Sequence, residues 1–149
     1  MITYHTLTTA SPLWSQATTQ VAAIDWPAGP HLAKRMRTPA VWQSFERVIY
    51  ATAGDQLAGF CALLAEDIVP NTTYSPFVSS VYVAPDYRHQ GLSLRLVQQA
   101  EKAAEESDID GLYIVTRHVG LYEHLNYALV DRREDQFGRL NHVLYKAFT

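Results

Sequence analysis

The residues with the clearest chemical signature form the turn Arg-His-Gln-Gly-Leu-Ser, residues 88–93. This turn follows a strand-like apolar run, residues 78–83, and precedes a stretch from Leu92 onward in which apolar side chains recur at helical spacing. The first backbone N–H groups of a helix have no partner within the helix, and the peptide dipoles add partial positive charge there. Such a turn can therefore bind an anion such as a phosphate, and Gly91 lets the backbone approach it closely.

The spacing Arg-x-x-Gly-x-Ser resembles the [Gln/Arg]-x-x-Gly-x-[Gly/Ala] motif of the GNAT superfamily of N-acetyltransferases, where these amides hold the pyrophosphate of acetyl-coenzyme A. Residues 81–87 look like the family's strand and turn before this motif. Residues 120–127, Gly-Leu-Tyr-Glu-His-Leu-Asn-Tyr, resemble its Leu-Tyr-Glu-Lys-x-Gly-Phe signature, with Asn126 where the family usually has glycine. The resemblance implies an N-acetyltransferase that uses acetyl-coenzyme A as acyl donor and needs no metal.

The resemblance also implies which residues contact the coenzyme. In the family, strands 4 and 5 splay apart at a bulge in strand 4, and unpaired backbone groups there bind the pantetheine arm. The loop after strand 5, where relatives often carry asparagine, contributes His118. The coenzyme-binding residues expected on this basis are Val81, Tyr82, Val83, Arg88, His89, Gln90, Gly91, Leu92, Ser93, Leu94 and His118.

Tyr122 matches the tyrosine that in many relatives stands near the thioester sulfur and acts as general acid. Transfer of an acyl group from a thioester to an amine needs a held coenzyme, a neutral amine and a proton donor for the departing thiolate. A phenol with a pKa near 10 is protonated at neutral pH, whereas a thiol with a pKa near 8.5 leaves as a thiolate that can accept its proton. We therefore expect direct transfer to a primary amine with Tyr122 as general acid.

The general base is less clear, because relatives often place a glutamate on strand 4 and residues 74–83 contain no acidic residue. Glu66 and Asp67, at the end of the preceding strand, could face the same cleft, and His118 is a further candidate. Of these, Glu66 is the residue that we name with Tyr122 as catalytic.

The acceptor pocket is expected from three connecting segments, residues 26–30, 67–74 and 135–139. Their aromatic side chains could line it, so the substrate-binding candidates are Trp26, Tyr74 and Phe137. The acceptor is a small-molecule or peptide amine. A polyamine, an amino acid, an antibiotic and a protein lysine or N-terminus all stay open, because a fold does not fix its substrate.

Hydrophobic periodicity and turn residues predict the element order β-α-α-β-β-β-α-β-α-β-β. The expected strands are residues 2–7, 47–53, 57–66, 74–83, 112–116, 128–132 and 142–148. The expected helices begin at a Ser11 N-cap, at residue 31, at residue 92 and at residue 119, and residues 26–30, with two prolines, form a loop. The fold class is α+β, a three-layer GNAT-like architecture: a mixed, mostly antiparallel sheet has helices on both faces and its strands 4 and 5 parallel and splayed.

Composition sets the remaining expectations. With 149 residues and 48% hydrophobic content, residues 1–149 form a single domain. The net charge of −3 provides no basic field for nucleic acid, and it also disfavours a toxin that acts on charged tRNA. The sequence shows no signal peptide and no run of about 18 apolar residues. We therefore expect a cytoplasmic location and no contact with a membrane. Many relatives are dimers, which leaves a homodimer open.

Three other classes of protein are weighed against this reading. A phosphotransferase would need Gly-x-x-x-x-Gly-Lys-[Ser/Thr], and a metal enzyme would show a spacing such as His-Glu-x-x-His; the sequence contains neither. The third is a catalytically inactive acyl-coenzyme A sensor or interaction module with the same fold. The missing strand-4 glutamate and the pair Arg117-His118 motivate it.

Overall fold

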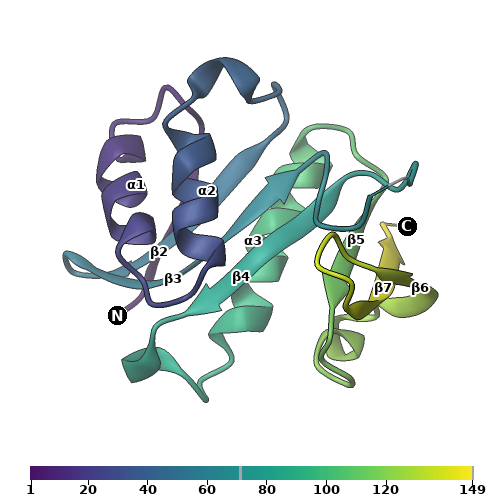
Figure 1. The fold of residues 1–149 in the computed structure, drawn as a ribbon. Helices are drawn as coiled ribbons and strands as arrows, with labels where there is room; N and C mark the ends of the chain where they lie inside the picture. The colour runs from purple at the N-terminus through teal and green to yellow at the C-terminus, as the bar shows by residue number, and fades with distance from the viewer. Residues whose placement is uncertain (71, 149) are drawn as a thin grey trace.

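The computed structural model describes residues 1–70 and 72–148, which form a seven-stranded sheet in the order β1-β2-β3-β4-β5-β7-β6 (Figure 1). The strands are β1 (Thr3–Leu7), β2 (Arg47–Ala53), β3 (Gln56–Leu64), β4 (Phe77–Val83), β5 (Gly111–Thr116), β6 (Ala128–Glu134) and β7 (Leu140–Ala147). The helices are α1 (Trp14–Ala22), α2 (Ala28–Met36) and α3 (Leu92–Glu106), with short 3₁₀ helices η1 (Pro39–Val41), η2 (Pro85–Tyr87) and η3 (Tyr122–Leu125). Neighbouring strands are antiparallel except β4 and β5, which are parallel. The predicted fold class is confirmed.

The sheet separates two layers of helix, with α1 and α2 side by side on one face and α3 on the other (Figure 1). Because successive strand residues point to opposite faces, β2 serves both layers. Val48 and Tyr50 pack in the cluster under α1 and α2, while Ile49 and Ala51 pack in the cluster under α3. No helix in the described part of the chain is long and apolar enough to cross a membrane.

The central feature of the sheet is the separation of β4 from β5. The two strands pair only through Phe77 with Tyr113 and Val78 with Ile114 among the described residues, and Figure 1 shows them diverging beyond this point. On its other edge β4 stays paired with β3, but its register shifts by one residue around Ser80, which has a φ of 56°. This β-bulge bends β4 away from β5. The splayed strands are therefore as expected.

The second helix begins earlier than expected, at Ala28 instead of residue 31. Pro27 precedes it and Pro30 lies in its first turn. The first residues of a helix have no carbonyl to donate to within the helix, so a proline there loses no hydrogen bond. The prediction of a loop over residues 26–30 is therefore wrong for residues 28–30, which belong to α2.

Ser11 is also placed differently. Helix α1 begins at Trp14, and the Ser11 hydroxyl accepts a hydrogen bond from the Thr8 amide (2.9 Å) instead of capping the helix. Strand β4 begins at Phe77, because Pro76 cannot donate to a neighbouring strand. Residues 119–125 shorten to the 3₁₀ helix η3, which ends at Asn126 in the left-handed conformation (φ 72°) that the sequence predicts.

Gly59 on β3 is needed where β4 bends. A Cβ at this position would lie 2.6 Å from the carbonyl oxygen of Tyr82 and 3.1 Å from a methyl carbon of Leu96. We expect Gly59→Ala to displace the β4 backbone and to lower the free energy of unfolding by about 1–3 kcal/mol, the usual scale of overpacking. Denaturant unfolding measures this, and a variant as stable as the parent would show that β4 moves freely at the bulge.

Candidate active site

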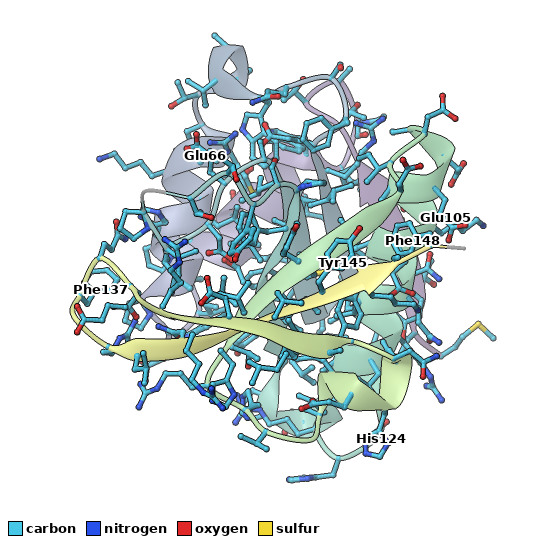
Figure 2. The ribbon with its side chains drawn as sticks, turned by 90° about the vertical axis from the view of Figure 1, so that its right-hand side faces the viewer. Glu66, Glu105, His124, Phe137, Tyr145 and Phe148 are labelled. Atoms are coloured by element: carbon cyan, nitrogen blue, oxygen red, sulfur yellow. The ribbon has the colours of Figure 1, made fainter. Side chains whose placement is uncertain are left out.

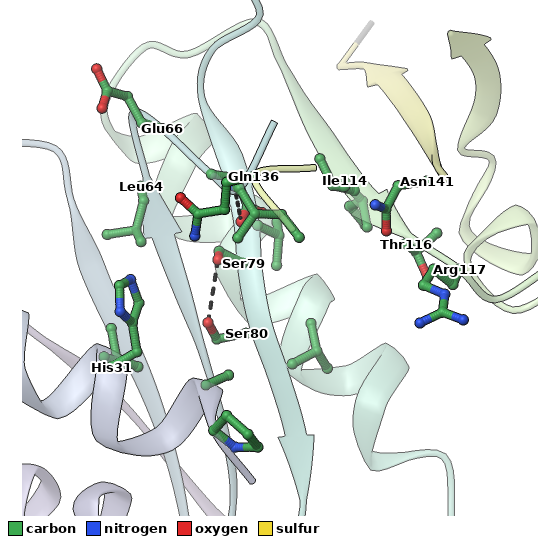
Figure 3. A pocket seen from close by; sticks show the side chains of 18 of the residues that line it. His31, Leu64, Glu66, Ser79, Ser80, Ile114, Thr116, Arg117, Gln136 and Asn141 are labelled. Carbon is green, nitrogen blue, oxygen red and sulfur yellow. Dashed lines mark hydrogen bonds between the residues drawn. The ribbon is translucent and has the colours of Figure 1, made fainter. Parts of the chain in front are cut away.

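A cavity of about 970 Å³ opens where β4 and β5 separate. Its walls come from α2, the end of β3 and the segment after it, β4, β5 and the β6–β7 loop. Leu32 in the wall belongs to the core cluster under α1 and α2, whereas Tyr122 belongs to the cluster under α3. The cavity therefore reaches through the gap in the sheet from one layer to the other. Figure 3 shows His31 on one side of β4 and Asn141 on the other.

The edge of β4 that faces the gap is open. Beyond Val78, β4 has no strand partner on the β5 side among the described residues. Its backbone polar groups from Ser79 to Val83 on that side can therefore bind an extended ligand in the manner of an added strand. The hydroxyls of Ser79 and Ser80 lie 3.3 Å apart beside this edge (Figure 3). The predicted coenzyme residues of β4, Val81, Tyr82 and Val83, lie along it.

The turn before α3 presents its backbone amides. Gly91 is the N-cap residue with a φ of 79°, and the Arg95 amide donates to the Gly91 carbonyl (3.2 Å) as the first bond of the helix. The amides of the residues between them, 92–94, have no carbonyl partner within the helix. The Arg88 Nε donates to the Val83 carbonyl oxygen (2.9 Å) and so ties the turn to the end of β4.

The rest of the predicted turn is arranged around these amides. His89 adopts the left-handed conformation with a φ of 64°, and Gln90 is exposed. The Leu92 side chain is buried in the core cluster under α3, and Leu94 is partly buried against the same cluster. Ser93 is half-buried in the first turn of the helix. The structure thus brings the predicted turn residues together beside the open edge of β4.

Tyr122 lies in the cavity wall at the start of η3 and is only 5% exposed. Burial, and to a smaller degree the neighbouring Cys61, raise the pKa of Tyr122 to about 12. Its hydroxyl makes no hydrogen bond within the described part of the chain, so it is available to a ligand. The phenol stays protonated at neutral pH and can donate a proton or a hydrogen bond.

The two carboxylates after β3 have different environments. Glu66 is exposed, and Figure 3 shows its carboxylate pointing away from Ser79 and Ser80. Asp67 is recessed, and burial raises its pKa to about 6 despite hydrogen bonds from the Ile68 amide (2.7 Å) and the Ser79 side chain. A carboxylate that titrates near neutral pH is suited to proton transfer. Of the two, Asp67 has the surroundings of a general base.

Buried Glu46 fixes the segment that carries these carboxylates. Its side chain accepts hydrogen bonds from the Ala65 amide (2.9 Å), the Gln43 amide (2.7 Å) and Arg35 Nη2 (2.7 Å). The Ser75 hydroxyl in turn donates to the Ala65 carbonyl (2.7 Å). Both backbone polar groups of Ala65 are thus held, and α2 is joined to the end of β3.

Asp135 holds the β6–β7 loop in place, as Glu46 holds the segment after β3. Burial alone would raise its pKa, but hydrogen bonds from the amides of Arg139 and Phe137 and from the side chains of Asn141 and Arg139 lower the pKa of Asp135 to about 2. The loop also bonds to the segment after β3 through the Gln136 amide and the Ile68 carbonyl (3.1 Å). A single ionised carboxylate therefore sets the shape of this wall.

The three aromatic residues predicted for the acceptor pocket have different positions. Trp26 and Phe137 line the cavity, with Phe137 at the exposed turn between β6 and β7 (Figure 2). Tyr74 does not: its hydroxyl donates to Asp131 (2.8 Å), and its ring stacks on Tyr113 with centroids 4.8 Å apart. It borders a smaller cavity of about 280 Å³. Tyr74 instead covers part of the sheet that no helix covers.

His118 also lines the cavity, where its amide donates to the Thr116 hydroxyl (3.0 Å). Several lining residues have no counterpart in the sequence analysis. Ser79 and Ser80 are a weak signal, as two polar residues inside an apolar strand, but nothing local marks His31 and Arg35 of α2 or Asn141 of β7. Gln136 and Arg139 lie within the predicted segment 135–139, although the prediction names only its aromatic residue.

Comparison with known proteins agrees with this geometry. An aminoglycoside N(6′)-acetyltransferase type 1 from Acinetobacter genomosp. 13 is 34% identical over 77 residues, a segment that spans 50% of this chain and 53% of that protein. The aminoglycoside 6′-N-acetyltransferase from Enterococcus faecium has the same fold, with a TM-score of 0.72 at 15% identity over 99% of this chain and 97% of that one. A GNAT acetyltransferase from Elizabethkingia anophelis, solved with acetyl-CoA bound, has a TM-score of 0.68 at 16% identity over 98% and 97% of the two chains.

The family profile described as "Acetyltransferase (GNAT) family" matches residues 15–127, from α1 to the residue before β6. This span contains the splayed strands, the turn before α3 and Tyr122. The chain is a member of the GNAT family of acetyltransferases.

Proposed function

We propose that this protein transfers an acetyl group from acetyl-coenzyme A directly to the primary amine of a small molecule or peptide. The observation that carries the proposal is the cavity through the sheet, because Asp67 and Tyr122 both line it. A proton acceptor and a proton donor are thus present in the wall of one cavity. The acetyl-CoA bound to the Elizabethkingia relative supports the choice of acyl donor.

The residues present fit this coenzyme. The open edge of β4 beyond Val78 offers backbone donors and acceptors to an amide-containing arm, and the amides of residues 92–94 offer donors to phosphates. Nothing lies within 4 Å of the position that a Gly91 Cβ would take, so there is open space over the turn. When bound, the coenzyme supplies an acyl group on a thioester and a thiolate leaving group.

Asp67 is the base in this proposal, in place of Glu66. An alkyl ammonium has a pKa near 10, so most acceptor molecules must lose a proton before the nitrogen can attack. With a pKa of about 6, Asp67 is ionised at neutral pH and can accept that proton, directly or through a water. It also supplies the carboxylate whose absence from β4 motivated the inactive alternative.

Tyr122 acts on the leaving group. As the nitrogen attacks the acyl carbon and the bond from that carbon to the sulfur breaks, the phenol donates a hydrogen bond and then its proton to the sulfur. The second proton that the nitrogen loses returns through water to the phenolate, and Asp67 gives the proton that it took from the ammonium to solvent. The raised pKa of Tyr122 keeps the phenol protonated at neutral pH and, because it lies above that of a thiol, makes the return of this second proton to the phenolate the step that completes the transfer.

Gly91→Ala should weaken binding of acetyl-coenzyme A by about tenfold or more, because the new methyl group occupies the space over the turn. Gly54→Ala is the matched control, since Gly54 also has a positive φ (61°) and an open Cβ position but lies in the β2–β3 hairpin. Both variants should lose about 1–2 kcal/mol of stability from left-handed strain. Calorimetric titration measures the affinity, and equal affinities of the two variants would remove the turn from the coenzyme site.

Tyr122→Phe should lower the rate of acetyl transfer by about 10²-fold or more while the affinity for acetyl-coenzyme A changes little. Stability should change little, because the hydroxyl has no hydrogen-bond partner in the described chain. Tyr127→Phe is the control: this tyrosine is also buried but does not line the cavity. Transfer at the parental rate by a folded Tyr122→Phe enzyme would show that another group protonates the sulfur.

Asp67→Asn should lower kcat/KM by about 10²-fold or more and abolish a limb of the pH profile that rises through about pH 6, where Asp67 ionises. The melting temperature at pH 7 should stay the same or rise. A carboxyl whose pKa is raised on folding destabilises the native state once pH exceeds its unfolded value, and the amide removes that penalty. Glu66→Gln makes the same change one residue away, and loss of the limb in that variant instead would assign the base to Glu66.

A further inference from the structure

We propose that the acceptor carries a carboxylate in addition to its primary amine, and that Arg35 and Arg139 bind this carboxylate. The inference rests on the proposed function, because it concerns the acceptor side of the same cavity. It is carried by the charges of the cavity wall and by the way in which each arginine is held.

Arg35 reaches the cavity from α2. Its Nη2 donates to the Glu46 carboxylate (2.7 Å) and to the Val41 carbonyl (3.3 Å), and its guanidinium lies over the Trp42 ring, 4.9 Å from the centroid. These contacts fix the plane of the guanidinium. They use only Nη2 among its three nitrogens. Nε is buried, and Nη1 makes no contact within the described residues. Arg35 is therefore oriented but keeps Nη1 as a donor for a ligand.

Arg139 reaches the cavity from the β6–β7 loop. Its Nε donates to the Asp135 carboxylate (2.9 Å), and its guanidinium lies over the Phe137 ring, 5.1 Å from the centroid. Its two terminal nitrogens make no contact within the described residues, and the side chain is 49% exposed. A guanidinium held through Nε presents its terminal N–H groups as a fork, the geometry that binds a carboxylate through two hydrogen bonds.

The carboxylates that hold these arginines do not line the cavity. The side chains of Glu46 and Asp135 are 1% and 0% exposed, whereas those of Arg35 and Arg139 are 32% and 49% exposed, so a ligand can reach the cations but not these carboxylates. The wall itself contains two carboxylates, Glu66 and Asp67. Glu66 points away from the β4 serines (Figure 3), and Asp67 has the proposed task of taking the proton of the amine.

An acceptor with several ammonium groups fits this wall poorly. One ammonium could approach Asp67, but the others would lie beside fixed guanidinium charges, and like charges at short distance select against a partner. An acceptor with one amine and one carboxylate satisfies both kinds of site. The wall thus favours an amino acid or peptide over a polycation such as the aminoglycosides named for the relatives.

The test compares acceptors that differ only in the carboxylate. The probes are phenylalanine against phenethylamine and 6-aminohexanoate against hexylamine, with spermine and kanamycin as polycations. Binding is titrated to the protein saturated with coenzyme A, and acetyl transfer is followed separately. We expect at least one carboxylate-bearing probe to bind about tenfold or more tightly than its matched amine and more tightly than either polycation.

Arg139→Gln tests the assignment. The variant should reduce binding of the preferred carboxylate probe by about tenfold to a hundredfold, while its matched amine binds as before, and should raise KM with little change in kcat. Arg139→Lys keeps the charge and should retain part of the preference. Arg132→Gln is the control, because Arg132 is exposed on β6 and does not line the cavity.

The outcomes separate this inference from the proposed function. Carboxylate preference without any acetyl transfer would uphold the anion site and overturn the proposed transfer to an amine. Tighter binding of spermine or kanamycin than of every carboxylate probe would overturn the anion site while leaving the transfer intact. Equal weakening of the carboxylate probe and its matched amine by Arg139→Gln would also overturn it, since Arg139 would then only hold the loop.

Discussion

The pairing between β4 and β5 stops after two residue pairs, and the rest of the site depends on this limit. Phe77 and Val78 join the strands, and the bulge at Ser80 then bends β4 away. Had the pairing continued, the β4 backbone groups would bond to β5 and the cavity would be closed. The sheet survives the interruption because each strand keeps a full antiparallel neighbour, β3 for β4 and β7 for β5. Helix α3 packs on both strands and so spans the gap.

Two buried carboxylates give the cavity walls their shape. An ionised carboxylate inside a protein is costly unless hydrogen bonds replace its water, and both Glu46 and Asp135 are surrounded by backbone amides and an arginine. Each one organises a segment without regular secondary structure. Asp67 differs, because it has fewer donors and a raised pKa. Glu46 and Asp135 thus hold segments of the cavity wall in place, whereas the raised pKa of Asp67 suits proton transfer.

The features that the sequence predicted well are local. The turn at Gly91, the left-handed Asn126 and the strands that flank residues 54–55 each depend on a few neighbouring residues, and the structure has all of them. Contacts between distant segments were not predictable in the same way. The difference between Glu66 and Asp67 arises from burial against β4, and Tyr74 leaves the pocket because Asp131 on β6 accepts its hydroxyl. The arginines of the wall look like ordinary surface charges until their distant carboxylates are seen.

The stacking of Trp26 on Tyr82 has an optical consequence. The sequence contains three tryptophans, of which Trp14 and Trp42 pack edge to face on each other with centroids 4.9 Å apart. Only Trp26 lines the cavity, and its ring stacks on Tyr82, a residue of the open β4 edge, at 6.0 Å. Since indole emission depends on the polarity around the ring, a ligand that displaces water from the cavity changes the environment of Trp26 directly, whereas Trp14 and Trp42 do not line the cavity. The protein therefore carries its own spectroscopic reporter of occupancy, one that requires no label.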